Sequence, residues 1–156
     1  MKFGSKKKNN TDRLHVICII CFIIYIITLL KLTVFRSGGT FMGGTLNLVF
    51  FKGYVQMVKH HVWGTFIYLF VGNIAWFVPL GFFLKFNLKN KWGLVVLYGF
   101  LVSLIIEILQ YIWGTGVTEV DDLILNTIGT IFGATIYSIA KRLFWDRRKG
   151  NISRET

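Results

Sequence analysis

Four long apolar runs divide the chain, at residues 14–35, 63–84, 92–113 and 123–140. An α-helix needs roughly 20 mostly apolar residues to cross the hydrocarbon core of a bilayer. The first three runs meet this requirement. The fourth run contains Asn, Thr and Gly among its apolar residues, so it needs neighbouring helices to cover these positions. The pattern predicts an all-α, polytopic membrane protein with four transmembrane helices.

Composition agrees with a membrane setting. The chain has 156 residues, of which 54% are hydrophobic and only 16% are charged. A soluble domain with this composition would expose too much apolar surface, and the length suits one compact bundle. The net charge of +11 does not indicate nucleic-acid binding, because the basic residues lie at the chain ends and in one short connection. We therefore predict one membrane domain, residues 14–140, between basic tails at 1–13 and 141–156.

The basic residues also predict the orientation, because the positive-inside rule places Lys and Arg in the cytoplasm. Three segments carry most of them: Lys2, Lys6, Lys7, Lys8 and Arg13; Lys85, Lys89 and Lys91; and Lys141, Arg142, Arg147, Arg148, Lys149 and Arg154. Residues 36–61 and 114–122 are poorer in basic residues and are assigned outside. We expect a multi-pass protein of the cell (plasma) membrane with both termini cytoplasmic. The first run is too long for a typical signal-peptide core, so we expect it to be kept as an anchor.

The connection between the first two runs is apolar but too short to cross a bilayer. It begins with a glycine-rich stretch at 37–44 and continues with apolar residues between 46 and 58. Such a segment is typical of interfacial or re-entrant structure, and we expect it to cover the outer end of the bundle. His60 and His61 follow it. Adjacent histidines at a membrane boundary are usually interfacial residues, so we predict no metal and no cofactor.

Glu107 is an ionisable residue inside the third apolar run. A carboxyl group in hydrocarbon costs roughly 2 to 4 kcal/mol on insertion scales, so a chain that keeps one usually has a partner or a task for it. At about 1.5 Å per residue, Glu107 lies roughly 9 Å from Trp113 at the outer end of this run, and Ser103 lies one turn deeper. The polar residues of the spans therefore concentrate in the outer half of the bilayer.

Helical spacing predicts that these polar residues meet. Ser103 and Glu107 are four residues apart, and Gln110 is three residues after Glu107. Asp122, Asn126 and the two glycines of a GxxxG follow the same spacing in the fourth run. Each set occupies one face of its helix, and the glycines allow a neighbouring helix to approach. We predict an outward-opening polar ligand site made of Asn73, Ser103, Glu107, Gln110, Asp121, Asp122 and Asn126. The alternative is a structural carboxyl group satisfied by amide neighbours.

Three blocks of the sequence resemble the successive signatures of the VanZ-like membrane protein family. They are Gly72-Asn73-Ile74 with Phe77-x-Pro79-x-Gly81; Ser103-x-x-x-Glu107-x-x-Gln110; and Asp121-Asp122-x-x-x-Asn126-Thr127-x-Gly129-x-x-x-Gly133. The resemblance covers roughly residues 14–140. It extends to the external segment, where Phe50 stands at a position usually occupied by proline. The arginine that the family commonly has before its paired acids is absent. The resemblance implies a cell-envelope membrane protein with a role in resistance to glycopeptide (teicoplanin-type) antibiotics.

Three classes of function remain open at this point. The leading hypothesis is a binding protein whose partners are membrane lipid and a lipoglycopeptide or lipid-linked envelope ligand, with residues 47–58 supplying apolar contact. The second is an intramembrane enzyme acting on an envelope lipid, with Glu107, Asp121 and Asp122 as acid–base groups. The chain has no G-x-S-x-G, HExxH or P-loop motif, which favours binding over catalysis. The third is a structural or assembly subunit, for example in a homo-oligomer.

Overall fold

The computed structural model describes residues 4–35, 43–88, 91–115 and 117–152, and of residues 4–12, 14, 15 and 145–152 it describes the backbone alone. The elements follow one another as α1 (Gly4–Thr33), β1 (Thr45–Asn47), α2 (Lys52–Lys59), α3 (Trp63–Leu88), α4 (Trp92–Trp113), β2 (Val117–Glu119) and α5 (Val120–Ile152). Helical backbone therefore continues across both of the predicted boundaries between the tails and the membrane domain. The basic residues Lys2, Lys89 and Arg154, together with Arg36 and most of the glycine-rich stretch, lie outside the described residues.

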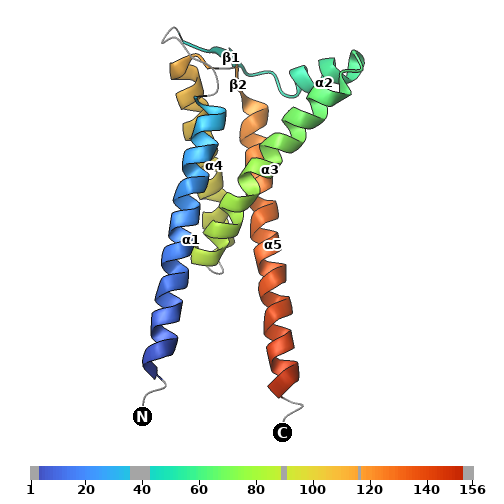
Figure 1. Ribbon diagram of the computed structural model, residues 1–156. Helices are drawn as coiled ribbons and strands as arrows, with labels where there is room; N and C mark the ends of the chain where they lie inside the picture. Colours follow the sequence, from blue (N-terminus) through green and yellow to red (C-terminus); the bar gives the residue numbers. More distant parts are fainter. Residues whose placement is uncertain (1–3, 36–42, 89–90, 116, 153–156) are drawn as a thin grey trace.

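Four of the described helices contain segments long and apolar enough to cross a membrane: Val16–Thr33, Trp63–Leu88, Trp92–Trp113 and Val120–Phe144. This confirms the predicted helical membrane fold with four spans. The start of α1 and the end of α5 lie at the same end of the molecule, while α2, β1 and β2 lie at the opposite end (Figure 1). The assignment of the first of these ends to the cytoplasm stays a prediction.

Helices α3 and α5 cross in close contact because glycines lie at the crossing. A Cβ atom on Gly129 would overlap the backbone carbonyl oxygen of Ile74, and one on Gly133 would overlap that of Val78. These two glycines of α5 are the GxxxG of the sequence, and they pack on α3 as the small-residue spacing predicts. The crossing therefore brings the backbones of α3 and α5 into direct contact.

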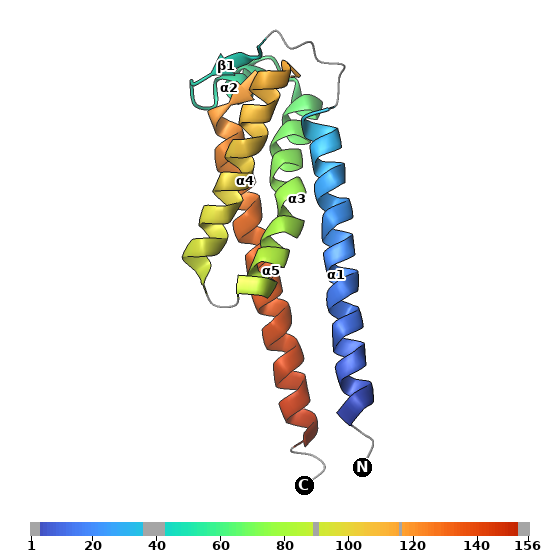
Figure 2. The same cartoon turned by 90° about the vertical axis from the view of Figure 1, so that its left-hand side faces the viewer.

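Helix α1 packs on the bundle mainly through its last turns. Leu29 and Val34 are buried with residues of α3 and α4, among them Phe77, Leu80 and Ile106. The Tyr25 hydroxyl donates a 2.6 Å hydrogen bond to the backbone carbonyl of Trp76 in α3. Figure 2 shows α1 alongside α3, with α2 and β1 together at the far end of the bundle. Most of the apolar residues in the earlier part of α1 are exposed, as expected of side chains that face lipid.

Two short strands, which the hydropathy pattern does not predict, close the end of the bundle. β1 pairs in parallel with β2, with Thr45 opposite Val117 and Asn47 opposite Glu119. The backbone N–H of Gly44 also donates to the carbonyl of Tyr111 at 2.7 Å. Gly44 and β1 are thereby fastened to the last turn of α4 and to β2. Strands of three residues carry little pattern of their own, so only the tertiary contact reveals them.

Helix α3 extends one turn further than the apolar run predicts, and Lys85 lies within that turn. The Lys85 side chain is 3% exposed, and its Nζ lies 3.9 Å from the centroid of the Trp92 ring at the start of α4. Among the described residues, Nζ has no hydrogen-bond partner. The distribution of basic residues assigns Lys85 to the cytoplasmic connection. In the structure it is a buried residue at the junction of α3 and α4.

Candidate functional site

Two of the acidic residues before and in the first turn of α5 hold the external segment in place. The backbone N–H of Phe51 donates to both carboxylate oxygens of Asp121 at 2.8 Å. Phe51 has a left-handed backbone, with φ 53°, immediately before α2, so Asp121 accepts the N–H that precedes this helix. The Asn47 side chain donates to Glu119 Oε1 at 3.0 Å and accepts the Val49 N–H at 3.2 Å. These contacts assign Asp121 and Glu119 a structural task.

Asp122 takes part in a polar group that joins three helices. Asn73 of α3 donates from Nδ2 to Asp122 Oδ1, and the same amide approaches the Tyr54 hydroxyl of α2 at 3.5 Å. The Tyr54 ring packs edge-on against Phe66 and Phe70. Burial raises the pKa of Tyr54 and the charge of Asp122 raises it further, so the hydroxyl stays protonated at neutral pH.

One turn further along α5, Asn126 meets Ser103. Its Nδ2 donates to Ser103 Oγ at 2.9 Å, and both side chains are buried. Among the described residues, Asn126 Oδ1 is buried without a hydrogen-bond partner. The predicted convergence of the polar faces of α4 and α5 is therefore present in the structure at this pair.

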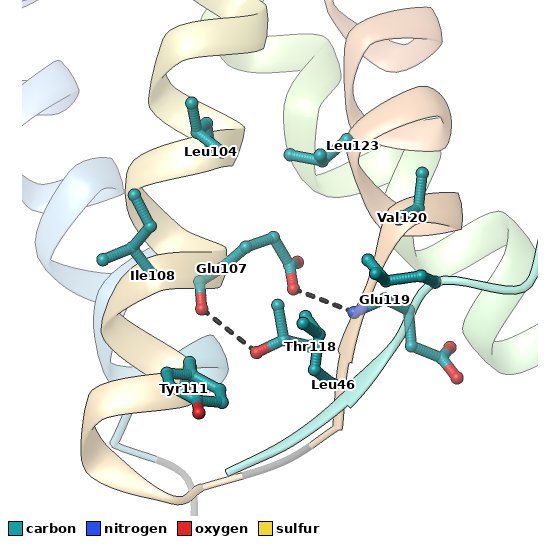
Figure 3. Close-up of a pocket in the computed structure, with 10 residues that line it drawn as sticks. Leu46, Leu104, Glu107, Ile108, Tyr111, Thr118, Glu119, Val120 and Leu123 are labelled. Atoms are coloured by element: carbon teal, nitrogen blue, oxygen red, sulfur yellow. Dashed lines mark hydrogen bonds between the residues drawn. The ribbon is translucent and has the colours of Figure 1, made fainter. Parts of the chain in front are cut away.

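Glu107 lies one turn from Ser103, towards the strand end of the bundle. Its side chain is 3% exposed, and its Oε2 accepts the backbone N–H of Glu119 at 3.2 Å. The Thr118 hydroxyl donates to the backbone carbonyl of Glu107, also at 3.2 Å. Figure 3 shows Glu107 extending from α4 towards the start of α5, with Leu104 and Ile108 on one side and Leu123 on the other. Glu107 thus connects α4 to β2.

A pocket of about 300 Å³ lies beside Glu107. Its walls come from β1, α4, β2 and the start of α5, and most of them are apolar. The lining residues are Leu46, Leu48, Leu104, Glu107, Ile108, Tyr111, Thr118, Glu119, Val120 and Leu123. The two strands cover the pocket at the end of the bundle, and Glu107 is the buried carboxyl group of its lining (Figure 3).

The electrostatic surroundings of this pocket are acidic. The charged neighbours of Glu107 are Asp122 and Glu119, and those of Asp122 are Glu119 and Asp121. In the part of the chain that the structure describes, no Lys, Arg or His forms an ion pair with any of these acids. No group of three metal-ligating side chains is found among the described residues either. The carboxyl groups are instead bonded to backbone N–H groups and side-chain amides.

The predicted site residues divide into separate groups. Glu107 lines the pocket, Ser103 and Asn126 bond to each other deeper in the bundle, and Asn73 bonds to Asp122. Gln110 turns towards α1, where its Nε2 donates to the Thr33 carbonyl at 3.3 Å. Among the described residues, Gln110 Oε1 is buried without a partner. Of these seven residues, Glu107 is the one that lines the pocket described above, and the role of the set in ligand binding stays a prediction.

Several residues of the site were not singled out from the sequence. Tyr54 joins the Asn73–Asp122 pair, and Thr118 bonds to Glu107. The apolar walls at Leu104, Ile108 and Leu123 look like ordinary lipid-facing or packing positions in a sequence. Leu104 lies three residues before Glu107 and four before Ile108, and this helical spacing is the one signal that could have placed Leu104 beside Glu107.

The acid–base alternative involves the same acids in different settings. Asp121 is 1% exposed and uses both oxygens for the Phe51 N–H, so its position suits a structural role. Glu107 and Asp122 therefore remain as the candidate acid–base residues, and Asp122 is a charged neighbour of Glu107. Neither is hydrogen-bonded to a Ser, Thr or Cys side chain that would serve as a nucleophile, within the residues described. Catalysis by this pair would therefore have to use water or a group of the substrate.

Comparisons with known proteins identify the same family that the sequence blocks around these residues resemble. Residues 22–141 match the VanZ/LLP1 family. The chain is 32% identical to Protein VanZ of Enterococcus faecium over 74 residues, which are 46% of this chain and 45% of that protein. Less than half of the relative's length is thus matched. No solved structure matches the chain. The family match covers every residue of α3 and α4, β2 and the first two-thirds of α5, and on this evidence the chain belongs to the VanZ/LLP1 family.

Proposed function

We propose that this protein acts in the cell envelope as a VanZ-type protein that lowers susceptibility to lipoglycopeptides of the teicoplanin kind. Its ligand, a lipoglycopeptide or a lipid-linked envelope molecule, binds at the pocket beside Glu107. The observation that carries this proposal is a buried carboxyl group in the lining of an otherwise largely apolar cavity. Ligand sites commonly combine apolar walls with a few placed polar groups. Family membership and the likeness to Protein VanZ support the envelope role.

The size of the pocket limits what enters it. A cavity of about 300 Å³ is at the lower end of the range of roughly 300 to 1,000 Å³ for small-molecule sites. It accommodates one chain or one small head group, not an entire glycopeptide. The remainder of such a ligand lies on the exposed apolar residues of the external segment, such as Leu48, Val49 and Phe50. Membrane lipid is the natural competitor for the same surface.

The proposed location is the plasma membrane, with the strand end outside and both termini in the cytoplasm. The distribution of Lys and Arg supports this orientation. A cytoplasmic reporter enzyme fused to either terminus should be active, and one inserted between α1 and β1 should be inactive. Activity of the inserted reporter would show that the orientation is the opposite one, with the pocket at the inner face of the membrane.

The functional test is the susceptibility of bacterial cells that express the protein. Expression should raise the inhibitory concentration of teicoplanin several-fold, and Glu107→Gln should abolish this rise at an unchanged membrane level of the protein. Gln keeps an acceptor oxygen for the Glu119 N–H, so it removes the ionisable group and keeps the contact. Asp12→Asn, a matched neutralisation in α1 near the opposite end of the molecule, should leave protection intact. Full protection by Glu107→Gln would overturn the proposal.

A further inference from the structure

The pocket beside Glu107 has apolar walls and a smaller polar part of the lining. Leu104 and Ile108 on α4 and Leu123 on α5 form its apolar walls. Glu107 lies between them, and the nearby polar lining is Thr118 and Glu119 of β2. A ligand that matches both parts has an apolar body and one polar group, and it places the polar group next to Glu107.

The Glu107 carboxyl group has no cationic counterpart in the described part of the chain. Its Oε2 accepts one backbone N–H, from Glu119, and its charged neighbours are Asp122 and the Glu119 side chain, which are both acidic. A buried charge far from water is stabilised chiefly by an opposite charge and further hydrogen bonds. A ligand cation that carries hydrogen-bond donors is the complement that would stabilise the carboxylate in these acidic surroundings. A protonated amine supplies both.

The exposure of the lining shows from which side a ligand reaches the pocket. The strands lie over it at the end of the bundle, whereas Ile108 is 48% and Tyr111 45% exposed on the flank of α4. Residues 92–113 form a membrane-spanning helix, so the exposed flank of its apolar side chains faces lipid. Leu46 and Leu48 of the external segment continue this apolar edge. A molecule dissolved in the bilayer meets the pocket without crossing water.

We propose that this pocket binds a protonated amine carried on a single alkyl chain, which enters sideways from the bilayer between α4 and α5. The ammonium group donates to Glu107, and the chain lies along Leu104, Ile108 and Leu123. This inference names the ligand class of the pocket and rests on the ligand site of the proposed function. Its binding test uses no measurement of antibiotic susceptibility.

The test is equilibrium binding to the purified full-length protein in discs of phosphatidylcholine, which has no net charge. The probes are radiolabelled dodecylamine, which is protonated at pH 7, and dodecanol, a neutral molecule of the same chain length. Dodecylamine should bind saturably, one per chain, and about tenfold or more tightly than dodecanol, because hydrogen bonds to charged groups are the stronger ones. Equal affinity for the two probes would overturn the inference.

Two variants and one control locate the binding. Glu107→Gln should remove the preference for the amine while leaving weak binding of both probes. Leu104→Trp should fill the cavity and weaken both probes together, and it keeps the inference testable if Glu107→Gln fails to fold. Asp12→Asn should bind as the wild type does. Amine binding that survives both pocket variants would place it elsewhere on the protein and overturn the assignment.

The same variants separate this inference from the proposed function. If Leu104→Trp loses protection against teicoplanin but the wild type binds amine and alcohol alike, the pocket has a function and the amine inference is wrong. If the amine preference depends on Glu107 but Glu107→Gln still protects the cell, the amine site stands and the role in susceptibility is wrong.

Discussion

The backbone N–H of Phe51 lies 2.8 Å from both carboxylate oxygens of Asp121, across 70 residues of sequence. This contact joins the start of α2 to the first turn of α5. Together with the pairing of β1 and β2, it fastens the external segment over the end of the bundle where Glu107 lies. An acid that resembles a catalytic or ligand-binding group in the sequence is here the residue that positions the cover of the site.

Asp121→Ala should therefore loosen the external segment. The part-buried Phe51 N–H would lose its carboxylate acceptor, and a hydrogen bond to a charged group contributes about 1.5 to 3 kcal/mol. We expect a lower unfolding temperature in detergent and faster proteolysis between α1 and α3. Thr28→Ala removes an exposed hydrogen bond within α1 and should change little. Equal protease sensitivity in the two variants would show that Asp121 does not hold the segment.

The crossing of α3 and α5 should not tolerate a larger residue at its glycines. Gly129→Ala or Gly133→Ala places a methyl group on a carbonyl oxygen of α3, and overpacking of this kind costs about 1 to 3 kcal/mol or more. Gly72→Ala is the matched control, because no atom lies within 4 Å of a Cβ there. It should be neutral or stabilise α3 by about 0.5 to 1 kcal/mol. Thermal unfolding in detergent measures both effects, and equal unfolding temperatures for the three variants would contradict the observed packing.

Ser103 and Asn126 should act as an energetic pair. Ser103→Ala leaves the buried Asn126 Nδ2 without its acceptor, at a cost of about 1 to 3 kcal/mol. Adding Asn126→Leu should recover much of this loss, because replacing both polar partners by apolar groups is often nearly neutral. A double-mutant cycle on the free energy of unfolding gives the coupling.

The same double variant tests whether this pair does more than pack. If it folds well and still protects cells against teicoplanin, Ser103 and Asn126 have a structural role only. If it folds well and protection is lost, they belong to the ligand site. Strictly additive effects of the two substitutions would contradict the hydrogen bond itself.

Lys85→Met should stabilise the protein. The Nζ atom is buried against the Trp92 ring, a contact worth roughly 0.5 to 2 kcal/mol, and the charge of Lys141 repels it. The effective cost of burying a charge is several kcal/mol, so the penalty exceeds the gain. We expect a higher unfolding temperature for Lys85→Met and no change for the exposed Lys91→Met. A lower unfolding temperature would indicate that an acceptor outside the described residues, such as a lipid phosphate, pairs with Lys85.

Hydropathy and helical spacing were sufficient to predict the membrane fold. The length of each apolar run predicts its span, because the bilayer thickness dictates it. Spacing of three and four residues predicted that the faces carrying Ser103 and Asn126 meet, and Gly129 and Gly133 indicated a close approach of a neighbouring helix, which the structure identifies as α3. These features depend on the spacing of residues along one helix or on the thickness of the bilayer. A short stretch of sequence is therefore enough to predict them.

Only the tertiary structure decided which partner each polar residue bonds to. Gln110 and Glu107 are one turn apart, yet Gln110 bonds to α1 and Glu107 to β2, because one face of α4 touches two different neighbours. Asp121 and Asp122 are adjacent, yet one holds the Phe51 N–H and the other the Asn73 amide. The parallel pairing of β1 with β2 joins segments far apart in the chain. No local pattern encodes these partners, since each is decided by which distant segment the packed helices bring within hydrogen-bonding distance.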